Sequence, residues 1–190
     1  EQTLVNGDFE KAKLLIQNGQ LIPIYKVIKL TKPKDEQSRK KTLNERLELI
    51  RILIDKGEDL NKKGDSDFDS PLIAAVSQDD KDLVELLISK GAKAFDKIET
   101  ELTPLEVAKS LDVVKVLIEK GLKSNLSEKY IFSVINQAAM TAGLMNNLDI
   151  LSYLIEKIVK NPEILSRVLF SMDFNYSPSI LEFLIKKGAD

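Results

Sequence analysis

The most constraining feature of this sequence is a short aliphatic segment that ends in glycine and recurs along the whole chain. The copies read LLIQNG, ILIDKG, LLISKG, VLIEKG and FLIKKG, and they end at Gly19, Gly57, Gly91, Gly121 and Gly188. A degenerate copy, YLIEKI, has Ile158 where the glycine is expected. The average interval of about 34 residues is typical of stacked helical arrays, in which no repeat buries its apolar face alone. Such arrays present an extended surface, which favours a binding function.

Residues 70–91 show how one repeat is expected to fold. Ser70 can cap a helix, and Pro71 suits the first helical position because its φ is fixed and it needs no amide donor. Leu72, Ala75 and Val76 form an apolar edge of this helix, and a polar turn at 78–80 separates it from a second apolar helix. Gly91 supplies the left-handed residue that ends the second helix. The pattern predicts two antiparallel helices per repeat.

Two short helices and a polar connector, recurring at about 33 residues, resemble the ankyrin repeat. Its motif T-P-L-H-x-A is met by TPLEVA at 103–108, with Glu106 in place of His, and more loosely by SPLIAA at 70–75. The resemblance implies an all-α fold, an ankyrin-type solenoid of stacked antiparallel helix pairs with short hairpin-like connectors and right-handed curvature. It is strongest at 58–121. A single domain is expected over 1–190, with repeats at 1–19, 20–57, 58–91, 92–121, 122–158 and 159–190.

The flanking repeats depart from the motif. Residues 21–30 predict an inner helix, 31–42 a charged loop and 127–147 a longer inner helix. Residues 161–179 keep only helical amphipathicity, as is common in end repeats that face water on one side. Asn146-Asn147-Leu148-Asp149 reads as a turn followed by a helix cap.

Composition and motifs exclude several kinds of site. There is no Cys and no His, so the chain has no disulfide, no thiolate or imidazole ligand and no Ser-His or Cys-His catalysis. The acids at 65–69 lack the glycine and the twelfth-position acid of a calcium loop. No phosphate-binding glycine motif occurs. The sequence therefore predicts a chain that is not an enzyme and has no cofactor or metal.

Charge and hydropathy also argue against nucleic acid and membrane partners. The net charge is −2, which gives no general attraction to polyanions. The basic run at Lys32, Lys34, Arg39, Lys40 and Lys41 is interrupted by acids and carries no aromatic residue for stacking on bases, so a solvated loop is the preferred interpretation. The apolar runs are too short for a membrane span.

The family resemblance also implies where a partner would bind. Ankyrin partners are usually held by the connectors and the exposed side of the inner helices, on the concave face. By alignment of the motif, the partner-binding residues are Ser66, Asp67, Phe68, Asp69, Ser77, Gln78, Phe95, Glu99, Thr100, Glu101 and Leu102. Phe68 and Phe95 lie in corresponding connectors, and each is either an anchor for a partner or a plug between repeats. Acids outnumber lysines in these connectors, which favours a partner with a basic patch.

The leading hypothesis is a non-enzymatic, monomeric module that binds another protein through its concave face. One version is a bacterial inhibitor or self-protection protein, since the Lys, Ile and Asn content is compatible with a bacterial origin and the lack of Cys with export. The alternative is a targeting or scaffold arm of a larger effector or enzyme, onto which Leu181 and Ile185 would pack; a plain spacer is a third reading. Met140 and Met145 are expected in the core. Cytoplasmic and exported locations both stay open.

Overall fold

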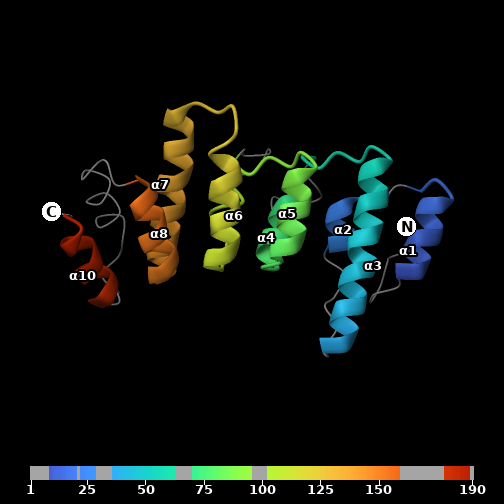
Figure 1. Ribbon diagram of the computed structural model, residues 1–190, viewed down its shortest axis with the longest axis horizontal. Coiled ribbons are helices and arrows are strands. Elements are labelled where there is room, and N and C mark those ends of the chain that lie inside the picture. Colours follow the sequence, from blue (N-terminus) through green and yellow to red (C-terminus); the bar gives the residue numbers. More distant parts are fainter. Residues whose placement is uncertain are drawn as a thin grey trace. The chain divides into compact units, whose positions relative to one another are not determined.

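The structure is a computed structural model that describes residues 9–20, 22–28, 36–62, 70–95, 102–158 and 178–188; the side chains of 36–43 and 158 lie outside this description. Within these ranges the chain forms helices and turns and contains no strand (Figure 1). The expected all-α class is confirmed. The chain divides into two compact units, of which the first extends to Lys93 and the second includes Ala94, Phe95 and the residues from Leu102. The continuity of one domain over the whole chain stays a prediction.

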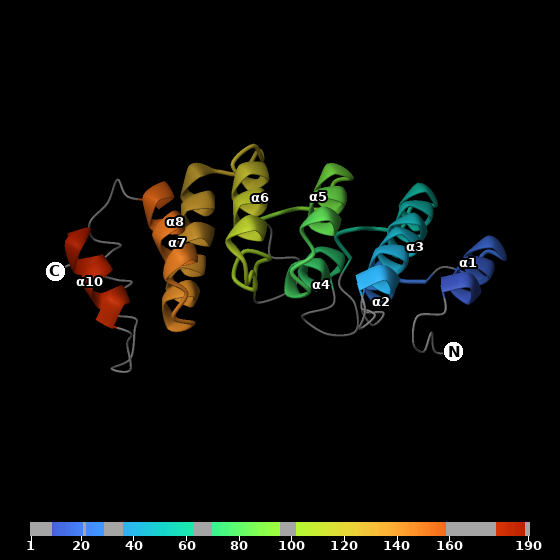
Figure 2. The same ribbon diagram turned by 60° about the horizontal axis from the view of Figure 1, so that its bottom comes forward.

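The first unit is built from helices that pack on their counterparts in the neighbouring repeat. Its helices are α1 (Phe9–Gln17), α2 (Ile24–Ile28), α3 (Glu36–Asp55), α4 (Pro71–Ser77) and α5 (Lys81–Ser89). The inner helix α2 packs on the inner helix α4, and the outer helix α1 packs on the outer helix α3 (Figure 2). Within each repeat, α2 also packs on α3 and α4 on α5. This is the arrangement of a helical solenoid.

The α4–α5 pair confirms the predicted caps and turn. The Ser70 hydroxyl accepts a hydrogen bond from the Ile73 amide at 3.2 Å, and Asp80 accepts one from the Leu83 amide at 3.2 Å. Gly91 ends the second helix with a φ of 106°. The predicted apolar edge of α4 is too narrow, however, because every residue from Pro71 to Val76 is buried. A short helix packed on both α2 and α5 has little surface left for water.

The charged segment at 31–42 differs from the expected loop. The helix α3 begins at Glu36 and runs without a break to Asp55, so residues 36–42 belong to it. After Pro33 this segment contains neither Pro nor Gly, and Glu, Gln, Arg and Lys are all good helix formers. Helix propensity therefore extends the outer helix backwards into the segment that was interpreted as a connector.

The second unit contains the predicted longer inner helix and its partner. Its helices are α6 (Leu111–Gly121), α7 (Glu128–Leu144), α8 (Leu148–Ile158) and α10 (Pro178–Lys186). The pair α7–α8 has the most extensive contact, and α8 also packs on α6 and α10. Asn146 has a positive φ of 56° and the Asn147 side chain accepts from the Ile150 amide at 3.1 Å, which confirms the predicted turn and cap between α7 and α8.

The TPLEVA segment does not form the inner helix that its resemblance to the repeat motif implied. Residues 104–107 make a single turn, closed by the Glu106 amide donating to the Thr103 carbonyl at 3.1 Å. The Glu106 carboxylate accepts from both the amide and the hydroxyl of Thr103, at 2.7 and 2.8 Å. Ser110 then caps α6 by accepting from Val113. Few residues separate the motif from α6, so a full inner helix has no room.

Gly121 is also different from the other glycines of the repeated segment. Gly19, Gly57, Gly91 and Gly188 have positive φ, whereas Gly121 is the last helical residue of α6 and has no such φ. A Cβ atom built at Gly121 would overlap the ring of Phe95. Gly121 therefore serves close packing, not a left-handed helix end.

Candidate partner-binding surface

The connectors that were predicted to bind a partner lie mostly outside the described residues. This applies to Ser66, Asp67, Phe68, Asp69, Glu99, Thr100 and Glu101. The structure does place Ser77 and Gln78, which are half-buried at the end of α4, and Leu102, which is half-buried after the second connector. Phe95, the remaining predicted residue, is buried. A partner surface on the connectors therefore stays a prediction.

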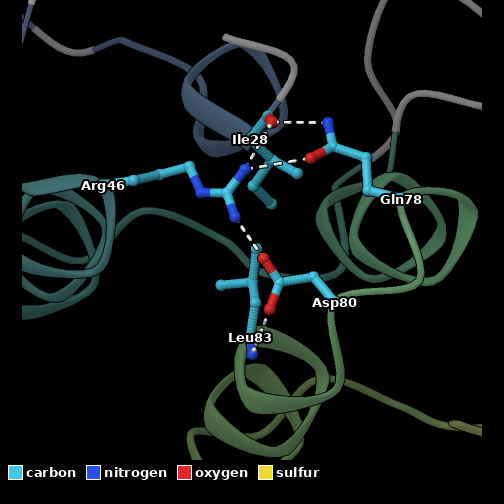
Figure 3. A network of polar contacts seen from close by, with 5 residues as sticks. All are labelled: Ile28, Arg46, Gln78, Asp80 and Leu83. Atoms are coloured by element: carbon cyan, nitrogen blue, oxygen red, sulfur yellow. Dashed lines mark hydrogen bonds and ion pairs between the residues drawn. The ribbon is translucent and has the colours of Figure 1, made fainter. Parts of the chain in front are cut away.

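Gln78 takes part in a polar network that joins two repeats of the first unit (Figure 3). Its amide nitrogen donates to the Ile28 carbonyl at 2.6 Å, and its amide oxygen accepts from the Arg46 guanidinium at 2.9 Å. Arg46 also forms an ion pair with Asp80 and reaches the Ile28 carbonyl at 3.4 Å. The network thus connects α2 and α3 with the turn between α4 and α5.

The charge of Arg46 is held in a buried position. Burial lowers the pKa of the Arg46 guanidinium, and the adjacent Asp80 carboxylate opposes that shift. Arg46 falls on the same helical face as Leu49, Ile50 and Leu53, all of which are buried. This spacing was the sequence signal for a buried arginine. The network braces the repeats, so the Gln78 amide is engaged within the chain and its assignment as a contact residue needs revision.

Phe95 fills the core of the second unit. Only 1% of its surface is exposed, its ring lies against Gly121, and its carbonyl accepts a hydrogen bond from the Tyr130 hydroxyl at 3.3 Å. Of the two alternatives for an aromatic in a connector, the placement of Phe95 is that of a plug. Its ring is not accessible to a partner.

Two asparagine side chains connect neighbouring repeats through main-chain atoms. In the first unit, the Asn61 amide donates to the Gly91 carbonyl at 3.2 Å and accepts from the Lys93 amide at 3.0 Å. In the second unit, the Asn147 amide donates to the Lys109 carbonyl at 3.4 Å. Both residues precede or cap elements in sequence positions that suggest only local turns, and so their longer-range role was not predicted.

The exposed side of α7 was missed by the sequence interpretation. Met145, expected in the core, is 76% exposed, and Phe132 and Leu144 are exposed on the helix itself. Met140 is half-buried. Exposed apolar side chains that gather on one element are characteristic of interaction surfaces. A pair of methionines near the end of an amphipathic helix was the available signal.

The described part of the chain offers no site for metal chemistry. No cluster of three or more Asp, Glu, His or Cys that could bind a metal ion occurs among the residues searched. Likewise, none of the helices within the described ranges combines the length and the apolar character needed to cross a bilayer. The polar groups found buried in the two units serve caps and contacts between repeats.

Comparison with known families agrees with the motif and the helix pairs. Residues 40–128 match the family model of ankyrin repeats, in three copies. Alpha-latrocrustotoxin-Lt1a of Latrodectus tredecimguttatus is 31% identical over 117 residues, which are 60% of this chain and 8% of that protein. Ankyrin repeat protein R599 of Acanthamoeba polyphaga mimivirus is 25% identical over 166 residues, which are 82% of this chain and 42% of that protein. No solved structure gives a significant match.

Each of these relatives is much longer than the chain, which spans less than half of either one. The family model covers the second, third and fourth predicted repeats, where the helix pairs α2–α3 and α4–α5 and the turn before α6 are found. Ankyrin repeats generally form non-enzymatic modules for interaction between proteins. On the combined grounds of motif, helix packing and family match, this chain is an ankyrin repeat protein.

Proposed function

We propose that this chain binds a partner protein with a basic patch, through the acidic connectors at 62–69 and 93–101 and the adjoining end of α4. The observation that carries the proposal is the charge of these connectors. Their acids are Asp65, Asp67, Asp69, Asp96, Glu99 and Glu101, against Lys62, Lys63, Lys93 and Lys97. An acidic edge accelerates encounter with a basic surface and disfavours acidic partners.

A finer version of this proposal is inhibition. An ankyrin module that covers the active site of a basic partner enzyme would act as an inhibitor or a self-protection protein. The two relatives come from a spider and a virus, so neither supports the bacterial origin that the composition suggested. The inhibitor version therefore rests on the acidic connectors alone.

Reversal of the connector charges tests the proposal. Asp67→Lys, Glu99→Lys and Glu101→Lys combined should abolish the binding of a basic protein in a pull-down, since each change replaces attraction by repulsion. The matched control reverses three exposed acids on outer helices, Asp82→Lys, Asp112→Lys and Glu156→Lys. Binding that survives in the connector variant, or is lost equally in the control, would contradict the proposed surface.

The second candidate function is a targeting or scaffold arm of a larger effector or enzyme. Leu181 and Ile185 on α10 are exposed, and an apolar edge on an outer helix suits packing against a further element. Fusion of the chain to a folded reporter at its C-terminal end should lower the accessibility of these two side chains only if that edge contacts the neighbouring domain. Unchanged labelling of a cysteine introduced at Leu181, with and without the natural continuation of the chain, would contradict this role.

A further inference from the structure

The helix α7 carries the longest uncharged stretch of the sequence. Residues 130–148 contain no charged side chain, although 31% of the residues in the chain are charged. The helix α7 (Glu128–Leu144) covers most of this stretch. A helix with one face in water normally carries charges on that face, so a solvent-facing side without any is unusual.

The two sides of α7 differ in what they contact. The side that packs within the second unit consists of Val134, Ile135, Ala138, Ala139, Ala142 and Gly143. On the other side, Phe132 is 38% and Leu144 57% exposed, and Ser133 and Gln137 are exposed between them. The surface of α7 that remains open is therefore a mixture of large apolar and small uncharged polar side chains.

The spacing of these side chains suits a second helix. Phe132, Asn136, Met140 and Leu144 follow one another at four-residue steps and so form a row along α7, which we call the α7 row. Rows with this spacing are the ridges that fit between the side chains of another helix. Met140 adds a flexible side chain that can adapt to the shape of its partner.

We propose that the α7 row docks an amphipathic helix of a partner protein whose contacting face is uncharged and aliphatic. A charged face would lose its hydration against α7 and find no counter-charge there, which is costly. Interface cores are depleted of charged residues and enriched in Met and aromatic residues, as is the α7 row. The inference rests on the proposed protein-binding function but uses a different surface and a different partner chemistry from the acidic connectors.

Two other occupants fit the α7 row less well. In an antiparallel pairing of two copies about the middle of the row, Asn136 of one copy would face Met140 of the other, and its amide would lack a partner. A membrane surface normally attracts helices with Lys or Arg on the polar side, and α7 has only Lys129, in its first turn. An uncharged partner helix meets neither objection.

A displayed library of amphipathic helical peptides, randomised at the four positions of one face, tests the inference on the full chain. Peptides selected by the wild-type chain should have Leu, Ile, Met, Ala or Ser on that face. Leu144→Glu should weaken the binding of the best peptide about tenfold or more, because a carboxylate would be buried in the contact. Leu14→Glu on α1 is the matched control, since Leu14 is 58% exposed and should leave the affinity unchanged.

Several results would overturn the inference. They are the recovery of no binding peptide, selected faces rich in Lys or Arg, equal weakening by the control, a dimer of the chain that Leu144→Glu dissociates, and binding to anionic phospholipid vesicles that Leu144→Glu abolishes. Gln137→Glu serves as a second variant if Leu144→Glu unfolds. Peptides with basic faces that are lost only in the connector variant would support the proposed function while refuting the α7 row.

Discussion

At the scale of single residues, the glycines of the repeated segment illustrate that one letter can serve two physical purposes. Gly57 and Gly91 have positive φ and open space around the position of a Cβ atom, so they are needed for their backbone conformation. Gly121 has an ordinary helical backbone and is needed because the Phe95 ring occupies the space beside it. In the sequence these glycines occupy equivalent positions in the repeated segment and cannot be distinguished.

Gly121→Ala is expected to destabilise the second unit although alanine is the better helix former. Overpacking against a buried ring costs about 1–3 kcal/mol, which exceeds the gain of about 1 kcal/mol from helix propensity. Urea unfolding followed by circular dichroism measures the difference. In a Phe95→Leu background the added methyl group has room, so Gly121→Ala should cost much less there. An equal loss in both backgrounds would mean that the Phe95 contact is not the cause.

At the scale of elements, the helix pairs were predictable because each follows a local rule of spacing and capping. Ser70, Asp80 and Asn147 cap helices as their positions in the sequence indicate. The start of α3 and the missing inner helix at 104–107 were not predicted, because both depend on how much chain is available between packed elements. A family motif indicates the repeat but does not fix the length of its helices.

Asn147 allows the cap of α8 to be separated from the contact between repeats. Asn147→Ala removes both the bond to the Ile150 amide and the bond to the Lys109 carbonyl, and it should cost about 1–2 kcal/mol. Asn147→Asp keeps the cap acceptor and loses only the donor to Lys109, so it should cost less than the alanine variant. Thermal unfolding of both variants measures the ranking. Asparagine and aspartate variants of equal stability would show that the bond between repeats contributes nothing.

At the scale of the whole molecule, the stability of a solenoid depends on contacts between neighbouring repeats. In the first unit these contacts include a buried polar network around Arg46 as well as the apolar core. The candidate site was only partly predictable for the same reason. The engagement of Gln78 depends on which helix of the neighbouring repeat comes close to it, and the exposure of Met145 depends on what leaves α7 uncovered. Neither is encoded in local spacing.

Arg46→Met is expected to weaken the coupling between the second and third repeats. The change leaves Asp80 buried without its partner, and breaking a buried ion pair in this way costs about 3–5 kcal/mol. Hydrogen exchange should accelerate in both α2 and α4, since the network joins them. Lys13→Met, which removes the exposed ion pair of Lys13 with Glu48, is the control and should change little. Faster exchange confined to α3 would refute the coupling.

The contact between Gly121 and Phe95 also has a consequence for how this chain can evolve. A side chain larger than hydrogen at 121 is excluded while the ring is present, whereas a smaller residue at 95 removes that restriction. Substitutions at the two positions are therefore accessible in one order only, with 95 changing before 121. Once 121 has gained a side chain, the return of an aromatic ring at 95 is blocked in turn. The pair acts as a one-way ratchet, and lineages that have passed it should carry both changes together.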